Sequence, residues 1–245
     1  KYREKKISAV LLHRYSFNDI AGSTTAVDTA DVSMWGGMRK NAIMKDSTGV
    51  ASSDLYIANG KATFQSNSIT NQPYFDLGNN IMESRTSIGI TIEMWVTTTN
   101  LNSLYSRIYF FGTGVKTTSS MMDNSLVLMR SSTPCLSMAI KGFDSNNIMN
   151  WASTCDAAIN FNNLNNAHVV AVYDFSAYQI RLYVDGELRS TTATTRTISA
   201  TTAINRIGMA LDDSSKPGFS GSFDEFRIWE GVLSPTHIAE HYRIG

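Results

Sequence analysis

The sequence has few cysteines, few prolines and no net charge. Its 245 residues include two cysteines and four prolines, and lysine plus arginine equals aspartate plus glutamate at 21 each. Without a net electrostatic field, the chain would attract neither nucleic acid nor an anionic membrane surface. No apolar run approaches the ~20 residues that span a bilayer. We therefore expect no nucleic-acid partner and no membrane insertion.

The chain also lacks the motifs of common hydrolases. Neither a Gly-x-Ser-x-Gly nucleophile motif nor a His-Glu-x-x-His zinc motif occurs. His237 and His241 lie four residues apart and could share a metal on a helix, but no carboxylate partner is evident. A solvated helix face is the favoured interpretation of this pair.

The two cysteines, Cys135 and Cys155, lie twenty residues apart. A disulfide between them would contribute about 3 kcal/mol for a loop of this length. Two free thiols are the alternative, because a pairing cannot be deduced from two positions alone. We predict the disulfide and leave the free thiols open. No CxxC motif or nearby histidine supports a zinc site at these cysteines.

The composition is that of a packed globule with a polar, weakly charged surface. Hydrophobic residues make up 42% of the chain, which argues against disorder, and charged residues make up 17%. Ser, Thr, Asn and Gly take the place of charges, as is common in extracellular β proteins. The basic cluster Lys1 to Lys6 falls in residues 1–7, which we interpret as a tail or linker.

Apolar residues alternate with polar ones along most of the chain. Ile90, Ile92, Met94 and Val96 share one side of a predicted strand, and Thr91, Glu93, Trp95 and Thr97 share the other. This period of two predicts antiparallel strands with one buried face and one solvated face.

Turn residues separate the predicted strands. Asn59-Gly60 and Asp185-Gly186 each stand between two apolar runs, which indicates hairpins with type I′ turns. The longest predicted loops are 22–41 and 142–156. Further strands are predicted at 10–17, 55–57, 62–64, 74–77, 107–111, 126–129, 136–140, 168–173, 180–184, 187–189, 206–210 and 222–229.

One short helix is predicted at the C-terminus. Ser234 is a suitable N-cap, Pro235 suits the first helical position, and Ile238 and Tyr242 share a face. More than ten short strands with almost no helix predict an all-β fold, a jelly-roll sandwich of two antiparallel sheets.

Three segments together resemble a known family. They are Leu11–Asn18, the pair His168–Asp174 and Ile180–Gly186, and Gly221–Trp229 followed by the short helix. Their order is similar to that of laminin-G-like members of the concanavalin A-like lectin/glucanase superfamily. The resemblance implies one jelly-roll domain over residues 8–245, in a family whose members mostly bind carbohydrates, proteins or calcium.

Some relatives on this fold are glycoside hydrolases, which use two carboxylates across a cleft. The Glu-x-Asp-x-Glu strand motif of the best-known group is missing here, and Glu93 stands alone on its strand. We therefore predict no catalytic residues and a protein that is not an enzyme, with a divergent glycoside hydrolase as the last alternative.

The resemblance implies a structural calcium ion beside Asp224. We expect this carboxylate to share the core side of its strand with Phe226 and Ile228, so that it needs a partner. The loop with Asp19, Asp28 and Asp31 could supply further oxygen ligands, of which calcium takes 6–8. The alternative is that Asp224 only accepts backbone N–H bonds.

A second calcium site is implied at the rim of the sandwich. Asp123 precedes a mid-chain strand, and Asp212 and Asp213 lie in a late loop, as ligands do in calcium-binding laminin-G modules. Plain loop polarity is the favoured alternative for these three residues.

Sugar binding on such a fold needs an exposed aromatic ring, on which the sugar's C–H face stacks. Trp35 and Trp151 fall in predicted loops and are the candidates for ligand binding; each could instead cap the core edge. We expect a non-catalytic, carbohydrate-binding module of an extracellular or cell-surface adhesive protein, with calcium as a candidate cofactor and a glycan or a surface or matrix protein as its partner. A structural or protein-interaction module of a filament, coat or virion is the alternative.

Overall fold

The structure is a computed structural model. It describes residues 9–33, 36–65, 72–82, 88–99, 104–113, 124–131, 133–143, 149–198, 202–209 and 218–245, with the main chain alone at 143 and 149–151. The predicted tail, residues 1–7, lies outside these ranges.

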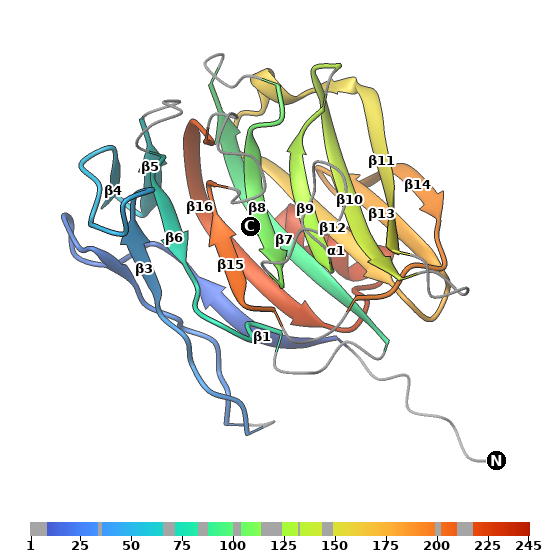
Figure 1. The fold of residues 1–245 in the computed structure, drawn as a ribbon, viewed down its shortest axis with the longest axis horizontal. Coiled ribbons are helices and arrows are strands. Elements are labelled where there is room, and N and C mark those ends of the chain that lie inside the picture. The colour runs from blue at the N-terminus through green and yellow to red at the C-terminus, as the bar shows by residue number, and fades with distance from the viewer. Residues whose placement is uncertain are drawn as a thin grey trace.

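The strands form two antiparallel sheets, which we name sheet A and sheet B (Figure 1). Sheet A has the order β14 (Glu187–Ala193), β13 (Gln179–Val184), β12 (Ala167–Asp174), β7 (Gly89–Thr98), β16 (Gly221–Glu230), β5 (Lys61–Phe64) and β4 (Leu55–Ala58), and β1 (Val10–Tyr15) also pairs with β16. Sheet B has the order β11 (Met149–Asn160), β10 (Cys135–Phe143), β9 (Ser125–Arg130), β8 (Arg107–Gly112), β15 (Ile204–Ile207), β6 (Tyr74–Asp76), β3 (Ala42–Lys45) and β2 (Thr25–Ala26). A 3-10 turn, η1 (Phe161–Asn163), follows β11.

The two sheets pack face to face around one apolar core. The inward side chains of β7 are Ile90, Ile92, Met94 and Val96, as their alternation predicts, and they pack with inward residues of sheet B such as Leu128. The predicted jelly-roll sandwich is confirmed, and so are both hairpins: Asn59, Gly60, Asp185 and Gly186 all have positive φ, as a type I′ turn requires.

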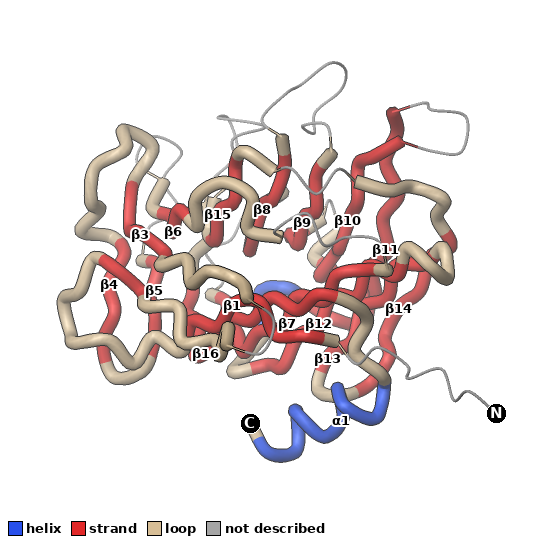
Figure 2. Tube along the Cα trace, turned by 90° about the horizontal axis from the view of Figure 1, so that it is seen from below, coloured by secondary structure: helices blue, strands red, loops and turns tan. Residues whose placement is uncertain are grey.

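The helix α1 (Pro235–Ile244) covers part of the outer face of sheet A (Figure 2). Ser234 caps it as predicted, accepting a hydrogen bond from the His237 backbone N–H. Ile238 is fully buried against Val170, Val172 and Tyr183 of the sheet. The prediction of a solvated face for β7 is therefore wrong over this region. Thr91, Glu93 and Trp95 lie on the same face of the sheet as α1 and are buried. No helix in the described part of the chain is long and apolar enough to cross a bilayer.

Two sequence predictions about loops are wrong. The predicted loop 142–156 contains most of β11, which is polar and pairs with β10 from Phe143↔Met149 to Cys135↔Asn160. Part of 22–41 forms β2, and β3 follows directly. Main-chain pairing with a neighbouring strand, not side-chain alternation, holds these segments extended.

Candidate functional site

The outer face of sheet A carries two groups of polar side chains, one in each of its two parts. One part lies beside α1 and is closed. The other lies over β4, β5 and the ends of β16 and β7 that meet them, and it is open to solvent at its edge. We describe the closed part first.

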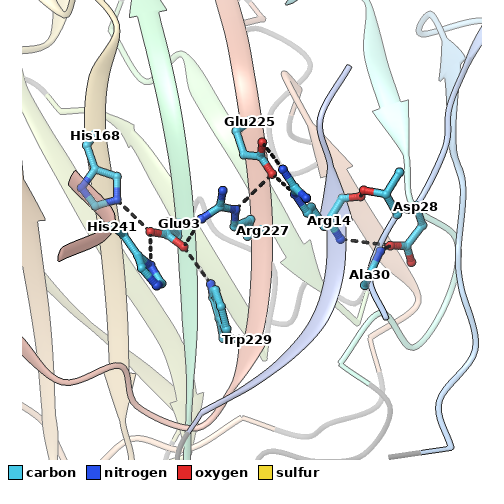
Figure 3. Close-up of polar contacts among 10 residues, drawn as sticks. Arg14, Asp28, Ala30, Glu93, His168, Glu225, Arg227, Trp229 and His241 are labelled. Carbon is cyan, nitrogen blue, oxygen red and sulfur yellow. Dashed lines mark hydrogen bonds and ion pairs between the residues drawn. The ribbon is translucent and has the colours of Figure 1, made fainter. Parts of the chain in front are cut away.

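Glu93 is the centre of the closed part (Figure 3). Its side chain is fully buried, and its Oε1 accepts hydrogen bonds from His168 Nε2 and His241 Nδ1, both at 2.8 Å. Its Oε2 accepts from Trp229 Nε1 at 3.0 Å and from Arg227 at 3.4 Å. The predicted solvated face is thus wrong for His241, which lies against Glu93 and stacks on Trp229.

These contacts keep Glu93 ionised. Burial by itself would raise the pKa of Glu93, but the hydrogen bonds from His168 and His241 and the charge of Arg227 outweigh it and lower the pKa to about 2. A carboxylate that is sealed from solvent and holds no proton can neither attack a substrate nor protonate a leaving group. Because Glu93 accepts a hydrogen bond from His241 of α1, we assign it a structural role: it holds the helix against sheet A.

Stability should fall in acid because of Glu93. A lowered folded-state pKa contributes stability that is present above the unfolded value of 4.5 and is lost as pH falls from there through about 2. For these two pKa values the loss at pH 3 is about 2 kcal/mol. Urea unfolding at pH 7 and pH 3 measures it. Glu93→Gln should flatten this pH dependence by that amount, and an unchanged slope would contradict the assignment.

A chain of ion pairs continues from Glu93 across sheet A (Figure 3). Arg227 also donates to Glu225 at 3.0 Å, and Arg14 of β1 donates to the same carboxylate. The Arg14 backbone N–H then donates to Asp28 at 3.0 Å. This chain ties β7, β16, β1 and the segment after β2 together.

Asp28, a predicted calcium ligand, is fully buried and has four donors from the protein. Its Oδ1 accepts from the backbone N–H groups of Arg14 and Ala30, and its Oδ2 accepts from His13 Nδ1 at 2.6 Å and the Lys40 N–H at 2.9 Å. Burial alone would raise the pKa of Asp28, but these hydrogen bonds lower it. With both oxygens occupied, this carboxylate does not fit the role of a calcium ligand.

Asp224 does not point into the core, so the prediction of its orientation is wrong. A β-bulge between Phe223 and Glu225 shifts the register of β16, which puts Phe223 and Phe226 inward and Asp224 outward. The Asp224 side chain is 30% exposed and forms an ion pair with Lys61 at 3.2 Å. Asp224 and Asp28 are not brought together, since Asp28 contacts His13 and Asp224 contacts Lys61.

Four of the other predicted site residues lie outside the described residues: Trp35, Asp123, Asp212 and Asp213. Trp151 lies in β11, opposite Lys141 of β10, so its predicted place in a loop is wrong. Within the described ranges no three His, Cys, Asp or Glu side chains gather as a metal site requires.

Cys135 and Cys155 are free cysteines, so the structure does not contain the predicted disulfide. Cys135 is buried, and its sulfur lies 3.0 Å from Ser131 Oγ. Cys155 as a whole residue is exposed, but its sulfur is partly buried. This partial burial and the neighbouring Cys135 together raise the pKa of the Cys155 thiol to about 11. A thiol with so high a pKa is a poor nucleophile at neutral pH.

The open part of sheet A carries a row of hydroxyl groups across four neighbouring strands. Register pairs Tyr56 of β4 with Thr63 of β5, Thr63 with Ser222 of β16, and Ser222 with Thr97 of β7. Their inward neighbours Ala62, Val96 and Phe223 are core residues, so all four members of this hydroxyl row face outward. At the strand spacing of ~4.8 Å the row is about 14 Å long.

A hollow of about 390 Å³ lies along the hydroxyl row. Among the described residues no hydrogen bond occupies the hydroxyls of Thr63 or Ser222, and the Tyr56 side of the row is exposed. No motif marks these residues, because the β4–β5 hairpin, β7 and β16 are far apart in sequence and only their pairing aligns them. The lining consists of Thr63, Phe64, Gln65, Thr97, Thr99, Ser220, Gly221 and Ser222.

The two sheets, their antiparallel order and the C-terminal helix define a lectin-type jelly-roll sandwich. The chain belongs to the concanavalin A-like lectin/glucanases superfamily, whose family model matches residues 47–239. This confirms the resemblance found in the sequence. No curated protein matches the sequence.

Three solved structures illustrate the shared fold. Domain 4 of AbnA, an extracellular arabinanase from Geobacillus stearothermophilus solved with arabinotriose, is 19% identical with a TM-score of 0.59, over 95% of this chain and 98% of that one. The CBM40 of the Ruminococcus gnavus IT-sialidase, bound to α2,3-sialyllactose, is 18% identical with a TM-score of 0.51, over 66% and 86%. The botulinum neurotoxin serotype D binding domain is 14% identical with a TM-score of 0.58, and this chain spans 50% of its length.

Proposed function

We propose that this chain is a non-catalytic carbohydrate-binding module and that the hydroxyl row is its binding site. The observation that carries the proposal is the row itself: four hydroxyl-bearing side chains, Tyr56, Thr63, Ser222 and Thr97, are aligned, and the last three line one hollow. A hydroxyl group both donates and accepts hydrogen bonds, and sugar hydroxyls do the same. A row of hydroxyls therefore complements successive hydroxyls of a short glycan.

Tyr56 supplies the apolar part of such a site. Its side chain is 36% exposed on the edge strand β4, and Gln65 Nε2 lies 3.4 Å from its hydroxyl oxygen. A ring held at the end of the row can take the C–H face of a sugar, while Gln65 offers an amide for its hydroxyls. This moves the proposed aromatic contact from Trp35 and Trp151 to Tyr56.

The comparisons support this proposal. Two of the similar structures were solved with arabinotriose or sialyllactose bound, and all three are parts of larger proteins. Glu93, the carboxylate at the centre of its strand, is sealed and bound by four donors, which favours a non-catalytic module. Because the similar structures include a domain of an extracellular arabinanase, we also propose an extracellular or surface location for this chain.

Removing two hydroxyls of the row should weaken glycan binding. We expect the double variant Thr63→Ala/Ser222→Ala to weaken binding at least tenfold, since each lost hydrogen bond is worth about 1 kcal/mol. Isothermal titration against an oligosaccharide panel measures the affinity. Thr191→Ala is the matched control, because Thr191 is an exposed threonine of the same sheet on its far edge strand β14.

Equal loss in the control, or full binding by the double variant, would place the site elsewhere. Circular dichroism of both variants should match the native protein, because neither substitution removes a buried contact.

Calcium stays a proposal for the rim residues Asp123, Asp212 and Asp213. If they bind calcium, saturation of the site should raise the melting temperature, because an ion that binds only the folded state stabilises it. Asp212→Asn/Asp213→Asn should cancel the shift, and Asp156→Asn, which removes the charge of an aspartate paired with Arg189, should keep it. A melting temperature that changes with neither calcium nor chelator would contradict the proposal.

A further inference from the structure

The hollow beside the hydroxyl row is built from uncharged stretches of chain. The residues that line it fall in three sequence segments, 62–75, 94–106 and 217–223, and none of these contains Lys, Arg, Asp or Glu. The segment 157–167, whose Asn166 N–H donates to Thr97 Oγ1 at 2.8 Å, has none either. In a chain with 42 charged residues, the described residues that line the hollow therefore carry no charged side chain.

The charges nearest to the row on its own sheet face are paired. Lys61 lies two residues before Thr63 on β5, and Asp224 lies two residues after Ser222 on β16. These two side chains form an ion pair with each other. Glu225 accepts from both Arg14 and Arg227, and Arg227 also reaches Glu93. A ligand at the row therefore meets hydroxyls, an amide and a phenol, and the cations described nearest to the row, Lys61, Arg14 and Arg227, each have a carboxylate partner.

We infer that the row binds a neutral oligosaccharide and selects against acidic glycans; this inference rests on the proposed function. A carboxylate or sulfate loses strong hydration on binding and needs an arginine or lysine to compensate. The hydroxyl row offers only neutral donors, and Asp224 adds a negative charge at the same end as Lys61. Neutral sugars lose less hydration and match the donors and acceptors of the row.

Paired glycans that differ in one acidic sugar test the inference. Two pairs are titrated into the nitrogen-15-labelled protein and followed by NMR: lactose with sialyllactose, and xylo-oligosaccharides with their glucuronic-acid-bearing counterparts. Neutral arabinotriose is titrated in the same way. Backbone amide shifts at Thr63, Thr97 and Ser222 report binding at the row. We expect the neutral member to bind at least tenfold more tightly. We also expect its affinity to change less than about twofold between ~50 and ~500 mM salt, because no ion pair is formed with the ligand.

A lysine placed in the row should reverse the preference. Ser222→Lys puts a cation at the centre of the row, and we expect an acidic glycan to gain about tenfold in affinity, with binding that weakens as salt rises. Thr191→Lys adds the same charge on β14, away from the row, and should leave the preference unchanged.

The outcomes separate the two proposals. An acidic glycan that shifts the amides of the row as strongly as its neutral counterpart overturns the inference and leaves carbohydrate binding intact. The absence of any shift at the row with every glycan overturns the proposed function and this inference with it. Neutral preference together with reversal in Ser222→Lys supports both.

Discussion

Glu93→Ala is expected to destabilise the protein by about 3–5 kcal/mol, the cost of removing one partner from a buried charge network. The substitution leaves His168, His241, Trp229 and Arg227 without the acceptor that they share. The loss should be concentrated at α1, because His241 is the helix residue bound to Glu93. Chemical denaturation gives the free energy, and hydrogen exchange shows whether α1 loses protection first.

Glu187→Ala is the control for Glu93. Glu187 lies on β14 of the same sheet, its side chain is 77% exposed, and its pair with Arg189 is 3.5 Å long. Such a surface pair contributes at most about 1 kcal/mol. If Glu93→Ala costs no more than this control, the network is not what fastens α1 to sheet A.

Asp28→Ala is expected to have an effect of similar size, about 3–5 kcal/mol. His13 places one ring nitrogen against Asp28 and the other 2.9 Å from the Ile81 carbonyl oxygen. Both ring nitrogens of this buried histidine therefore have an oxygen partner within hydrogen-bond distance. Without Asp28 the buried His13 ring would lose one of its two partners, and three backbone N–H groups would lose their acceptor.

Thermal and urea unfolding measure the effect of Asp28→Ala. Asp31→Ala is the matched control, because Asp31 is an exposed aspartate three residues further along the same loop, bound to Ser33. The substitution Asp28→Ala should also leave calcium affinity unchanged. A loss of calcium binding without a loss of stability would return Asp28 to the set of metal ligands.

Most strands could be predicted because their side chains alternate. In β7 and β13 every second residue enters the core, so burial of one face is written in the residue order. β11 could not be predicted this way, since its residues Met149–Asn160 are mostly polar and it is the last strand of sheet B. The family was recognisable from the late strands and the closing helix, since these residues also shape the core.

The candidate sites fared less well than the fold. The orientation of Asp224 was predicted wrongly because a β-bulge changes the register of β16. The residue order of β16 does not predict this bulge. Glu93 looked like a lone carboxylate, because its partners stand 75 to 148 residues away. The hydroxyl row was not predicted, since no two of its members are neighbours in sequence.

The sequence by itself determined the class of fold, the two type I′ hairpins, the capped helix and the uncharged segments from which the hollow is lined. These follow from local propensity, from the alternation of apolar residues and from composition. Only the tertiary structure decided which polar residues meet. It buried Glu93 and Asp28 among donors, turned Asp224 outward to Lys61, and aligned Tyr56, Thr63, Ser222 and Thr97. The physical reason is that strand register and sheet order bring distant residues together, and pairing between strands sets both.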